Sequence, residues 1–181
     1  NVVRRALVEM IVRGMVRERC TQGLRITHQC TPGLEWRVEP FVGIDCDGIG
    51  LAQRTQIIWG LRNCRCKPTV GAINGWALGG GTELLLTLDI RLVAQEAKLG
   101  LPEINLGLFP GAGGSQRIIR QVPLCRAKEL MFTGNQITAA EAVELGLCNR
   151  AVPRAQLMEV VMELANQIAQ KSPLTLKLLK R

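Results

Sequence analysis

The fold of this chain is decided by residues 68–94, which read PTVGAINGWALGGGTELLLTLDIRLVA. Residues 69–74 are a short apolar run after a proline, a pattern typical of a buried strand. Three glycines then lead into a helix that we expect over residues 82–88, and residues 90–94 are a second buried strand. A strand, a helix and a strand in close succession predict an α/β domain built in layers.

Strand and helix signals continue on both sides of this stretch. After it we expect helices at 111–122 and 126–132, a capping box from Thr138 to Glu141, a strand at 147–152 and a helix at 153–171. Before it we expect a strand at 24–29 and a helix at 51–63. Apolar residues at positions 7, 10, 11, 15 and 16 lie near helical spacing, so residues 1–20 are predicted to form an amphipathic helix with a basic face.

Composition limits the class of protein. The chain has 181 residues, of which 47% are hydrophobic and 21% charged, as in an ordinary globular domain and unlike a disordered segment. Its apolar runs are too short for a membrane-spanning helix, which needs about 20 apolar residues. The seven cysteines are odd in number and scattered, and there is one histidine, so we expect free thiols in a reducing compartment and no metal site.

The positive charge points to an anionic ligand. The net charge is +8, and most of the cationic side chains are arginines, which recognise phosphate and carboxylate groups with a planar fork. A phosphorylated ligand, an acidic partner and a nucleic acid are all compatible with this charge.

The first candidate for chemistry is the glycine cluster with Glu83. A helix that begins at a glycine offers backbone N–H groups without helical partners, and such a group pointing at a carbonyl oxygen is half of an oxyanion hole. Glu83 follows Gly80 by three residues, so its carboxylate can lie on the same side of the helix. The alternative is purely structural: the glycines allow close packing, and Glu83 complements the helix dipole.

A second cluster holds Glu103, followed by LGLFPGAGGS at residues 106–115. Neither glycine cluster has the pattern of a phosphate-binding loop or of a dinucleotide-binding turn. An isolated glutamate here would usually be a surface residue. Together with Glu83, however, it can form an acid/base pair around one polarised carbonyl group.

At this point the sequence resembles a known family. Residues 68–115, and then Ala127-Lys-Glu-Leu, Phe132-Thr-Gly, Ala140-Glu-Ala and Ser172-Pro-Leu, are similar to the crotonase (enoyl-CoA hydratase/isomerase) superfamily. The resemblance implies a crotonase-type α/β fold, a ββα spiral with a C-terminal helical segment. It places the core at residues 1–152, without the family's opening hairpin, and the start of a shortened C-terminal helical region at 153–181.

The resemblance also implies roles for individual residues. Gly80 matches the glycine that donates one oxyanion N–H, and Glu83 and Glu103 match the two catalytic glutamates of the hydratases. Glu83 would deprotonate a water that adds at C3 of an enoyl-CoA thioester, and Glu103 would handle the proton at C2. The second oxyanion donor is expected at Ile44, in Phe41-Val-Gly-Ile-Asp45, where the family's usual motif is altered.

Further expectations concern ligands and partners. We expect the substrate to contact Ala77, Leu78, Asp45, Pro110 and Gly111. The coenzyme A belongs to the substrate, so no separate cofactor is expected. The resemblance implies exposed apolar surface that the family uses for trimer contacts, so we expect a homotrimer, a pair of trimers, or a subunit of a larger complex.

Two other functions remain open at this stage. A catalytically idle structural subunit would fit the altered motif near Ile44, and RNA binding would use Arg5, Arg13 and Arg17 on the predicted first helix. The family resemblance points to fatty-acid β-oxidation and to the mitochondrial matrix, with the cytoplasm as the alternative.

Overall fold

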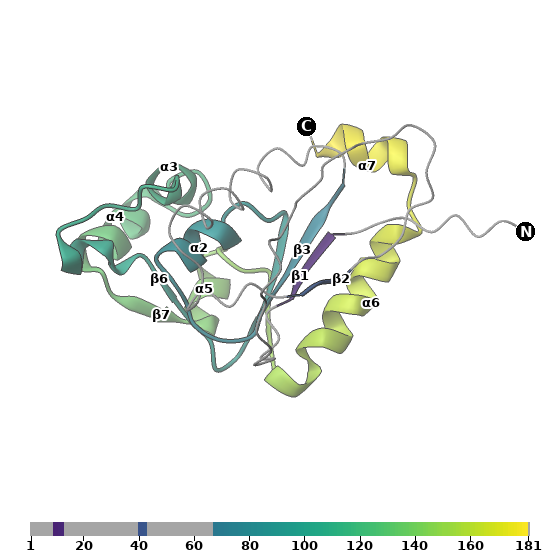
Figure 1. The fold of residues 1–181 in the computed structure, drawn as a ribbon, viewed down its shortest axis with the longest axis horizontal. Helices are drawn as coiled ribbons and strands as arrows, with labels where there is room; N and C mark the ends of the chain where they lie inside the picture. Colours follow the sequence, from purple (N-terminus) through teal and green to yellow (C-terminus); the bar gives the residue numbers. More distant parts are fainter. Residues whose placement is uncertain (1–8, 13–39, 43–66, 181) are drawn as a thin grey trace, which may run out of the picture.

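A computed structural model describes residues 9–12, 40–42 and 67–180 of the chain (Figure 1). Its strands are β1 (Glu9–Val12), β2 (Pro40–Val42), β3 (Thr69–Ile73), β4 (Ala77–Leu78), β5 (Ile90–Ala94), β6 (Lys98–Gly100), β7 (Gln136–Thr138) and β8 (Arg150–Val152). Its α-helices are α2 (Gly80–Leu85), α3 (Gly114–Ile118), α4 (Leu124–Thr133), α5 (Ala139–Glu144), α6 (Leu157–Ala169) and α7 (Pro173–Leu179). Two 3₁₀ helices complete the list, η2 (Pro102–Leu106) and η3 (Arg154–Gln156).

Two sheets organise these elements. The larger sheet is parallel, in the order β2-β1-β3-β5-β8, with Glu9 opposite Thr69 and Val70 opposite Ile90. All five residues of β3 are buried, as expected for a strand in the middle of a parallel sheet. The smaller sheet has the order β4-β6-β7, and only its β6–β7 pair is antiparallel.

The helices lie at two ends of the molecule. Figure 1 shows α6 and α7 beside β1 and β3, whereas α2 to α5 gather with the smaller sheet at the opposite end. Helix α6 buries Leu157, Val161 and Ala165, which recur every four residues and therefore form one stripe along the helix. Among the described residues, no helix is both long enough and apolar enough to cross a membrane.

Helix α7 is held against the sheet by a polar cluster centred on Asp89. The Lys180 ammonium lies 2.8 Å from Asp89 Oδ2. The same oxygen accepts hydrogen bonds from the Thr69 N–H at 2.6 Å and the Thr69 hydroxyl at 2.8 Å. The end of α7 is thereby tied to the start of β3 and to the residue that precedes β5.

The α/β layering predicted from residues 68–94 is confirmed, and so are the two strands at 69–74 and 90–94 as β3 and β5. The helix at 111–122 is shorter than predicted, because it begins only after Gly113, whose φ of +95° is left-handed. The predicted strand at 24–29 and helix at 51–63 lie outside the described residues.

The helix predicted over residues 1–20 is wrong where the structure describes it, because residues 9–12 form strand β1. Met10, Ile11 and Val12 are three consecutive apolar residues, and β1 pairs with β2 on one side and β3 on the other. A continuous apolar run is the usual pattern of such an interior parallel strand. Strand pairing therefore outweighs the helical spacing of the apolar residues.

Candidate active site

Gly80 begins α2 directly after a tight turn from β4. Gly79, the residue before the helix, has a φ of +53°, a backbone conformation that residues other than glycine rarely adopt. Its N–H donates to the Gly100 carbonyl oxygen in β6 at 2.9 Å. Because Gly80 is the first helical residue, its N–H precedes every carbonyl group that α2 could offer it. The helix itself therefore does not use this N–H, which is a first requirement for an oxyanion donor.

Glu83 lies one turn further along α2 and is held by the second glycine cluster. Its side chain is 4% exposed, and its Oε1 accepts a hydrogen bond from the Gly114 N–H at 2.9 Å. A Cβ atom on Gly114 would lie only 2.8 Å from Glu83 Cγ, so a glycine is required at this contact. The glycines at 111–114 thus bring backbone up to the carboxylate, which fixes its orientation.

Arg117 supports this contact from α3. Its guanidinium donates to the Ala112 carbonyl oxygen at 2.8 Å. Arg117 Nη1 would also lie only 2.8 Å from a Cβ atom on Gly113, so the guanidinium packs closely over that glycine. The arginine therefore holds the loop that ends at Gly114, and so also holds the Gly114 N–H that donates a hydrogen bond to Glu83.

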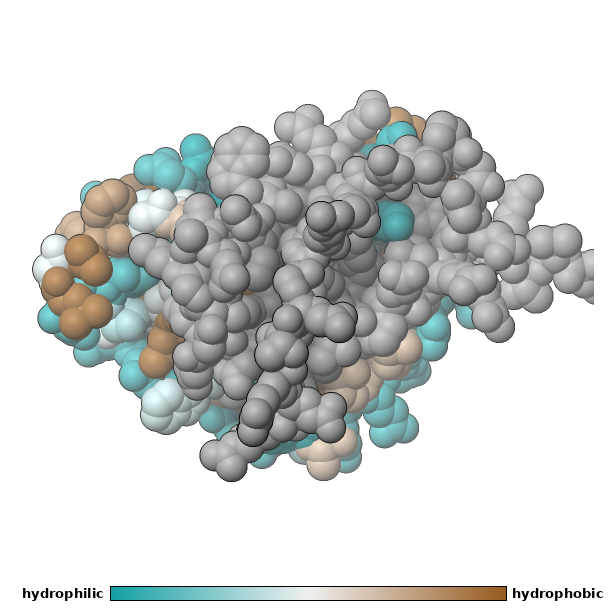
Figure 2. Space-filling model, viewed as in Figure 1, coloured by the Kyte–Doolittle hydropathy of each residue, from teal (hydrophilic) through white to brown (hydrophobic). Residues whose placement is uncertain are grey.

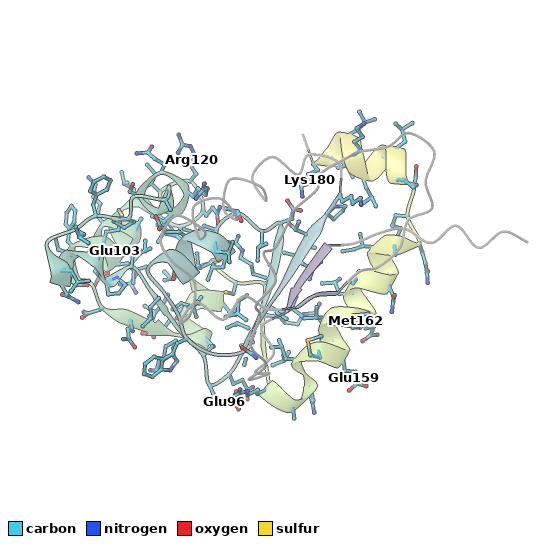
Figure 3. The ribbon with its side chains drawn as sticks, viewed as in Figure 1. Glu96, Glu103, Arg120, Glu159, Met162 and Lys180 are labelled. Carbon is cyan, nitrogen blue, oxygen red and sulfur yellow. The ribbon has the colours of Figure 1, made fainter. Side chains whose placement is uncertain are left out.

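Glu103 approaches the same turn from η2. It is half-buried, and its Oε1 lies 3.1 Å from the position of a Cβ atom on Gly79. Its Oε2 is buried and has no hydrogen-bond partner among the described residues. Figure 3 shows Glu103 at the end of the molecule that α2, α3 and α4 form. Glu103 therefore lies beside the turn that precedes α2, and Glu83 lies in the first turn of that helix.

The pKa of Glu103 is raised above its usual value of 4.5, chiefly because burial disfavours the charged carboxylate. The nearby negative charge of Glu83 raises the pKa further, and a backbone hydrogen bond opposes both effects. The expectation that close approach and burial raise the pKa of at least one glutamate is confirmed for Glu103.

The other predicted site residues fall into two groups. Ala77 is buried and Leu78 half-buried in β4, while Pro110 is buried and Gly111 exposed in the loop before α3. Ile44 and Asp45 lie outside the described residues, as do Arg5, Arg13 and Arg17 of the predicted basic face. Within the described part of the chain, no group of histidine, cysteine or acidic side chains could hold a metal ion.

Sequence reasoning did not anticipate that Gly114 and Arg117 would hold the carboxylate of Glu83 and the loop beside it. Gly114 belongs to a glycine cluster that the sequence did single out, but nothing in that pattern indicates that its N–H reaches Glu83, 31 residues away. Taken together, the residues provide a backbone donor, an oriented carboxylate and a second carboxyl group that holds its proton to higher pH. These are the parts needed for proton transfer next to a polarised carbonyl group.

Comparisons with known proteins agree with this geometry. A sequence model of the family described as enoyl-CoA hydratase/isomerase matches residues 53–181. The short-chain-enoyl-CoA hydratase of Clostridium acetobutylicum is 44% identical over 115 residues, which are 64% of this chain and 44% of that protein. The probable mitochondrial enoyl-CoA hydratase of Dictyostelium discoideum is 45% identical over 114 residues, 63% of this chain and 41% of that protein.

Solved structures show the same fold. An enoyl-CoA hydratase subunit from Geobacillus kaustophilus superposes with a TM-score of 0.67 and 42% identity, over 72% of this chain and 50% of that one. The crotonase-type fold predicted from the motifs is therefore confirmed. The chain spans about half the length of the relatives that it matches.

Proposed function

The chain belongs to the enoyl-CoA hydratase/isomerase family, and on this premise we propose that it adds water across the 2,3 double bond of an enoyl-CoA thioester. One observation carries the proposal: the Glu83 carboxylate on α2 accepts from the Gly114 N–H, and the Glu103 carboxylate on η2 lies 3.1 Å from where a Cβ atom of Gly79, just before α2, would be. Relatives named enoyl-CoA hydratases support the same reaction.

In the proposed mechanism, the Gly80 N–H donates to the thioester carbonyl oxygen and stabilises the negative charge that develops there. Ile44 is the proposed second donor. Glu83 takes a proton from a water while the water oxygen bonds to C3. The electron pair of the double bond moves toward the carbonyl group, and Glu103 delivers a proton to C2. A raised pKa suits Glu103 to this role, because the acid is protonated at higher pH.

The remaining predicted residues are proposed to contact the substrate, whose coenzyme A is its own and not a resident cofactor. Ala77 and Leu78 lie just before the Gly79–Gly80 turn, and Pro110 and Gly111 lie in the loop that leads to Gly114 and Glu83. Both pairs are therefore close in sequence to the proposed reacting groups. Asp45 is assigned to the same role from the family resemblance alone.

Replacing either glutamate by glutamine tests the proposal. Glu83→Gln and Glu103→Gln should each lower the hydration rate by about 10²–10⁴-fold, the usual contribution of a general acid or base. The assay is the loss of enoyl-thioester absorbance, and calorimetry with a saturated acyl-CoA should show that binding persists. Glu96→Gln is a matched control, because Glu96 is an exposed glutamate away from the Gly79–Gly80 turn (Figure 3).

Two outcomes would contradict the enzyme assignment. One is a wild-type protein that binds no acyl-CoA, and the other is full activity in both glutamine variants. Either result would favour the alternative of a structural subunit that keeps the fold without the chemistry.

We also propose that the chain assembles as a homotrimer, alone or as a pair of trimers. The support is a group of exposed apolar side chains on η2, the loop after it and α4: Ile104, Leu106, Leu108, Phe109, Leu124 and Phe132. Figure 2 shows hydrophobic residues gathered at that end of the molecule. A monomer rarely leaves so many large apolar groups uncovered in one region.

The proposed location is the mitochondrial matrix, and the proposed pathway is fatty-acid β-oxidation. The mitochondrial relative from Dictyostelium supports the location, whereas a bacterial relative shows that the family is not confined to mitochondria. Fractionation of cells that express the full-length protein would decide between matrix and cytoplasm.

A further inference from the structure

Thr82 is a buried polar residue between Gly80 and Glu83 that the proposed mechanism does not use. Its side chain is 1% exposed. Its hydroxyl donates to the Ala77 carbonyl oxygen at 2.5 Å and accepts a hydrogen bond from the Gly100 N–H at 3.1 Å. One hydroxyl therefore joins α2 to two strands, β4 and β6.

These bonds are not the ordinary way in which a helical threonine satisfies its hydroxyl. That bond runs to a carbonyl group three or four residues earlier in the same helix. Ala77 is five residues earlier and belongs to β4, and Gly100 belongs to β6, 18 residues later. Both hydrogen bonds are buried. Removing the hydroxyl would leave the Ala77 carbonyl oxygen and the Gly100 N–H without this partner, and water cannot reach them to take its place.

The same strand end also holds the turn before the helix. The Gly100 carbonyl oxygen accepts from the Gly79 N–H at 2.9 Å, so both backbone polar groups of Gly100 bond to the start of α2. Gly100 itself has no room for a side chain, because a Cβ atom there would lie 2.9 Å from the Asn135 carbonyl oxygen. The Gly79–Gly80 turn is thus fixed against a closely packed part of the smaller sheet.

We infer that Thr82 is a positioning residue: its hydroxyl holds the Gly79–Gly80 turn so that the Gly80 N–H points at the carbonyl oxygen of the substrate. The inference rests on the proposed function for the role of Gly80. It goes beyond that function by assigning the direction of the donor to a side chain that never touches the substrate. An oxyanion donor acts through its direction and distance, so a small rotation of the turn weakens it.

Thr82→Val and Thr82→Ser form a matched pair for the test. Valine keeps the shape of threonine without the hydroxyl, and serine keeps the hydroxyl without the methyl group. We expect Thr82→Val to lower kcat by about 10- to 100-fold with KM changed less than about threefold, since removing a whole oxyanion donor costs about 10²–10³-fold. Thr82→Ser should restore kcat to within about threefold of wild type. If Thr82→Val does not fold, Thr82→Ala replaces it.

Two further readouts separate positioning from general stability. The first readout is the infrared spectrum of bound butyryl-CoA labelled with ¹³C at the thioester carbonyl. Binding to wild type and to Thr82→Ser should lower the carbonyl stretching frequency relative to free butyryl-CoA. Binding to Thr82→Val should lower it less. Hydrogen exchange of the Gly79 and Gly100 amides should be about tenfold faster in Thr82→Val than in wild type. Amides of β5 should exchange at the wild-type rate, which shows that the sheet is intact.

The outcomes distinguish the two proposals. A wild-type protein that neither hydrates enoyl-CoA nor shifts the carbonyl frequency contradicts the proposed function, and the exchange rates still decide whether Thr82 holds the turn. An active wild type with Thr82→Val unchanged in kcat, carbonyl frequency and exchange overturns the inference about Thr82. A Thr82→Ser variant as impaired as Thr82→Val also overturns it, because the hydroxyl would then not be the group that matters.

Discussion

Glu103 has a carboxyl group that the fold stabilises poorly in its charged form. One of its oxygens is buried without a hydrogen-bond partner among the described residues, and the pKa of the group is raised by burial and by Glu83. A residue used only for stability would be expected to find a partner for that oxygen. An unpaired buried oxygen next to a second carboxylate is instead typical of a residue kept for function.

This property predicts how Glu103→Gln changes stability with pH. Because the folded pKa lies above the usual 4.5, the folded chain keeps a proton that the unfolded chain releases, and the free energy of unfolding falls as pH rises through that interval. Glutamine has no such proton. The variant should therefore be more stable than wild type at pH 8, and the difference should shrink as the pH falls toward 4.5.

Urea denaturation from pH 4 to pH 8 measures this difference. Glu96→Gln serves again as the control, and its difference from wild type should show no comparable trend with pH. A Glu103→Gln variant that is less stable than wild type at every pH would contradict the prediction.

At the scale of single elements, α5 has the most complete local stabilisation. The Glu141 N–H donates to the Thr138 hydroxyl at 3.2 Å, and Glu141 Oε2 accepts from the Thr138 N–H at 2.7 Å. The hydrogen bonds from the backbone and the hydroxyl of Thr138 lower the pKa of Glu141. This reciprocal pair confirms the capping box predicted from the sequence.

Thr138→Ala should lower the free energy of unfolding by about 0.5–2 kcal/mol, because the first turn of α5 loses a side-chain acceptor. Thr138→Ser keeps the hydroxyl, so its free energy of unfolding should fall much less than that of Thr138→Ala. Chemical denaturation at neutral pH measures both variants. Equal losses for alanine and serine would show that the methyl group, rather than the cap, is responsible.

The sequence predicted those elements whose signal is local. Strands β3 and β5 are five-residue segments, mostly apolar and mostly buried, and the cap of α5 is a four-residue motif. Strands β4, β6 and β7 have two or three residues, too few for any periodicity to show, so the smaller sheet was not predicted. Strand β1 was mistaken for a helix because its identity depends on pairing with residues far along the chain.

The site was predictable to a similar extent. Gly80, Glu83 and Glu103 belong to recognisable motifs, and the structure brings all three to one turn. The carboxylate of Glu83 is oriented by the Gly114 N–H, and α2 is bonded through the Thr82 hydroxyl to the Gly100 N–H and the Ala77 carbonyl oxygen. These are backbone groups, and every residue has a backbone N–H or carbonyl group, so no residue type in the sequence marks which ones are used.

At the scale of the whole molecule, the apolar residues near η2 and α4 set the expected assembly. Phe109 is 75% exposed and Leu106 78%, and both follow Glu103 closely in sequence. Contacts between copies would therefore form beside the proposed catalytic residues. Covering these side chains is the favourable contribution that association provides.

Light scattering should give a mass about three times the 19.9 kDa of the chain, or a multiple of that value. Leu106→Ser combined with Phe109→Ser should shift the mass toward that of the monomer, whereas Met158→Ser, on α6, should leave it unchanged. A wild-type protein that is monomeric at all concentrations would contradict the proposed assembly.

The order of strands in the larger sheet also has a consequence for how the chain is made. Strand β3 pairs with β1, which is synthesised before it, and with β5, which is synthesised after it; β5 then pairs with β8. When the residues of the site have just left the ribosome, the outer edge of β5 has no partner, because β8 follows them in the chain and has not yet emerged. An unpaired edge of apolar residues is prone to join other chains. The nascent protein therefore passes through a period in which the proposed catalytic residues have already emerged but the larger sheet is still open at the edge of β5.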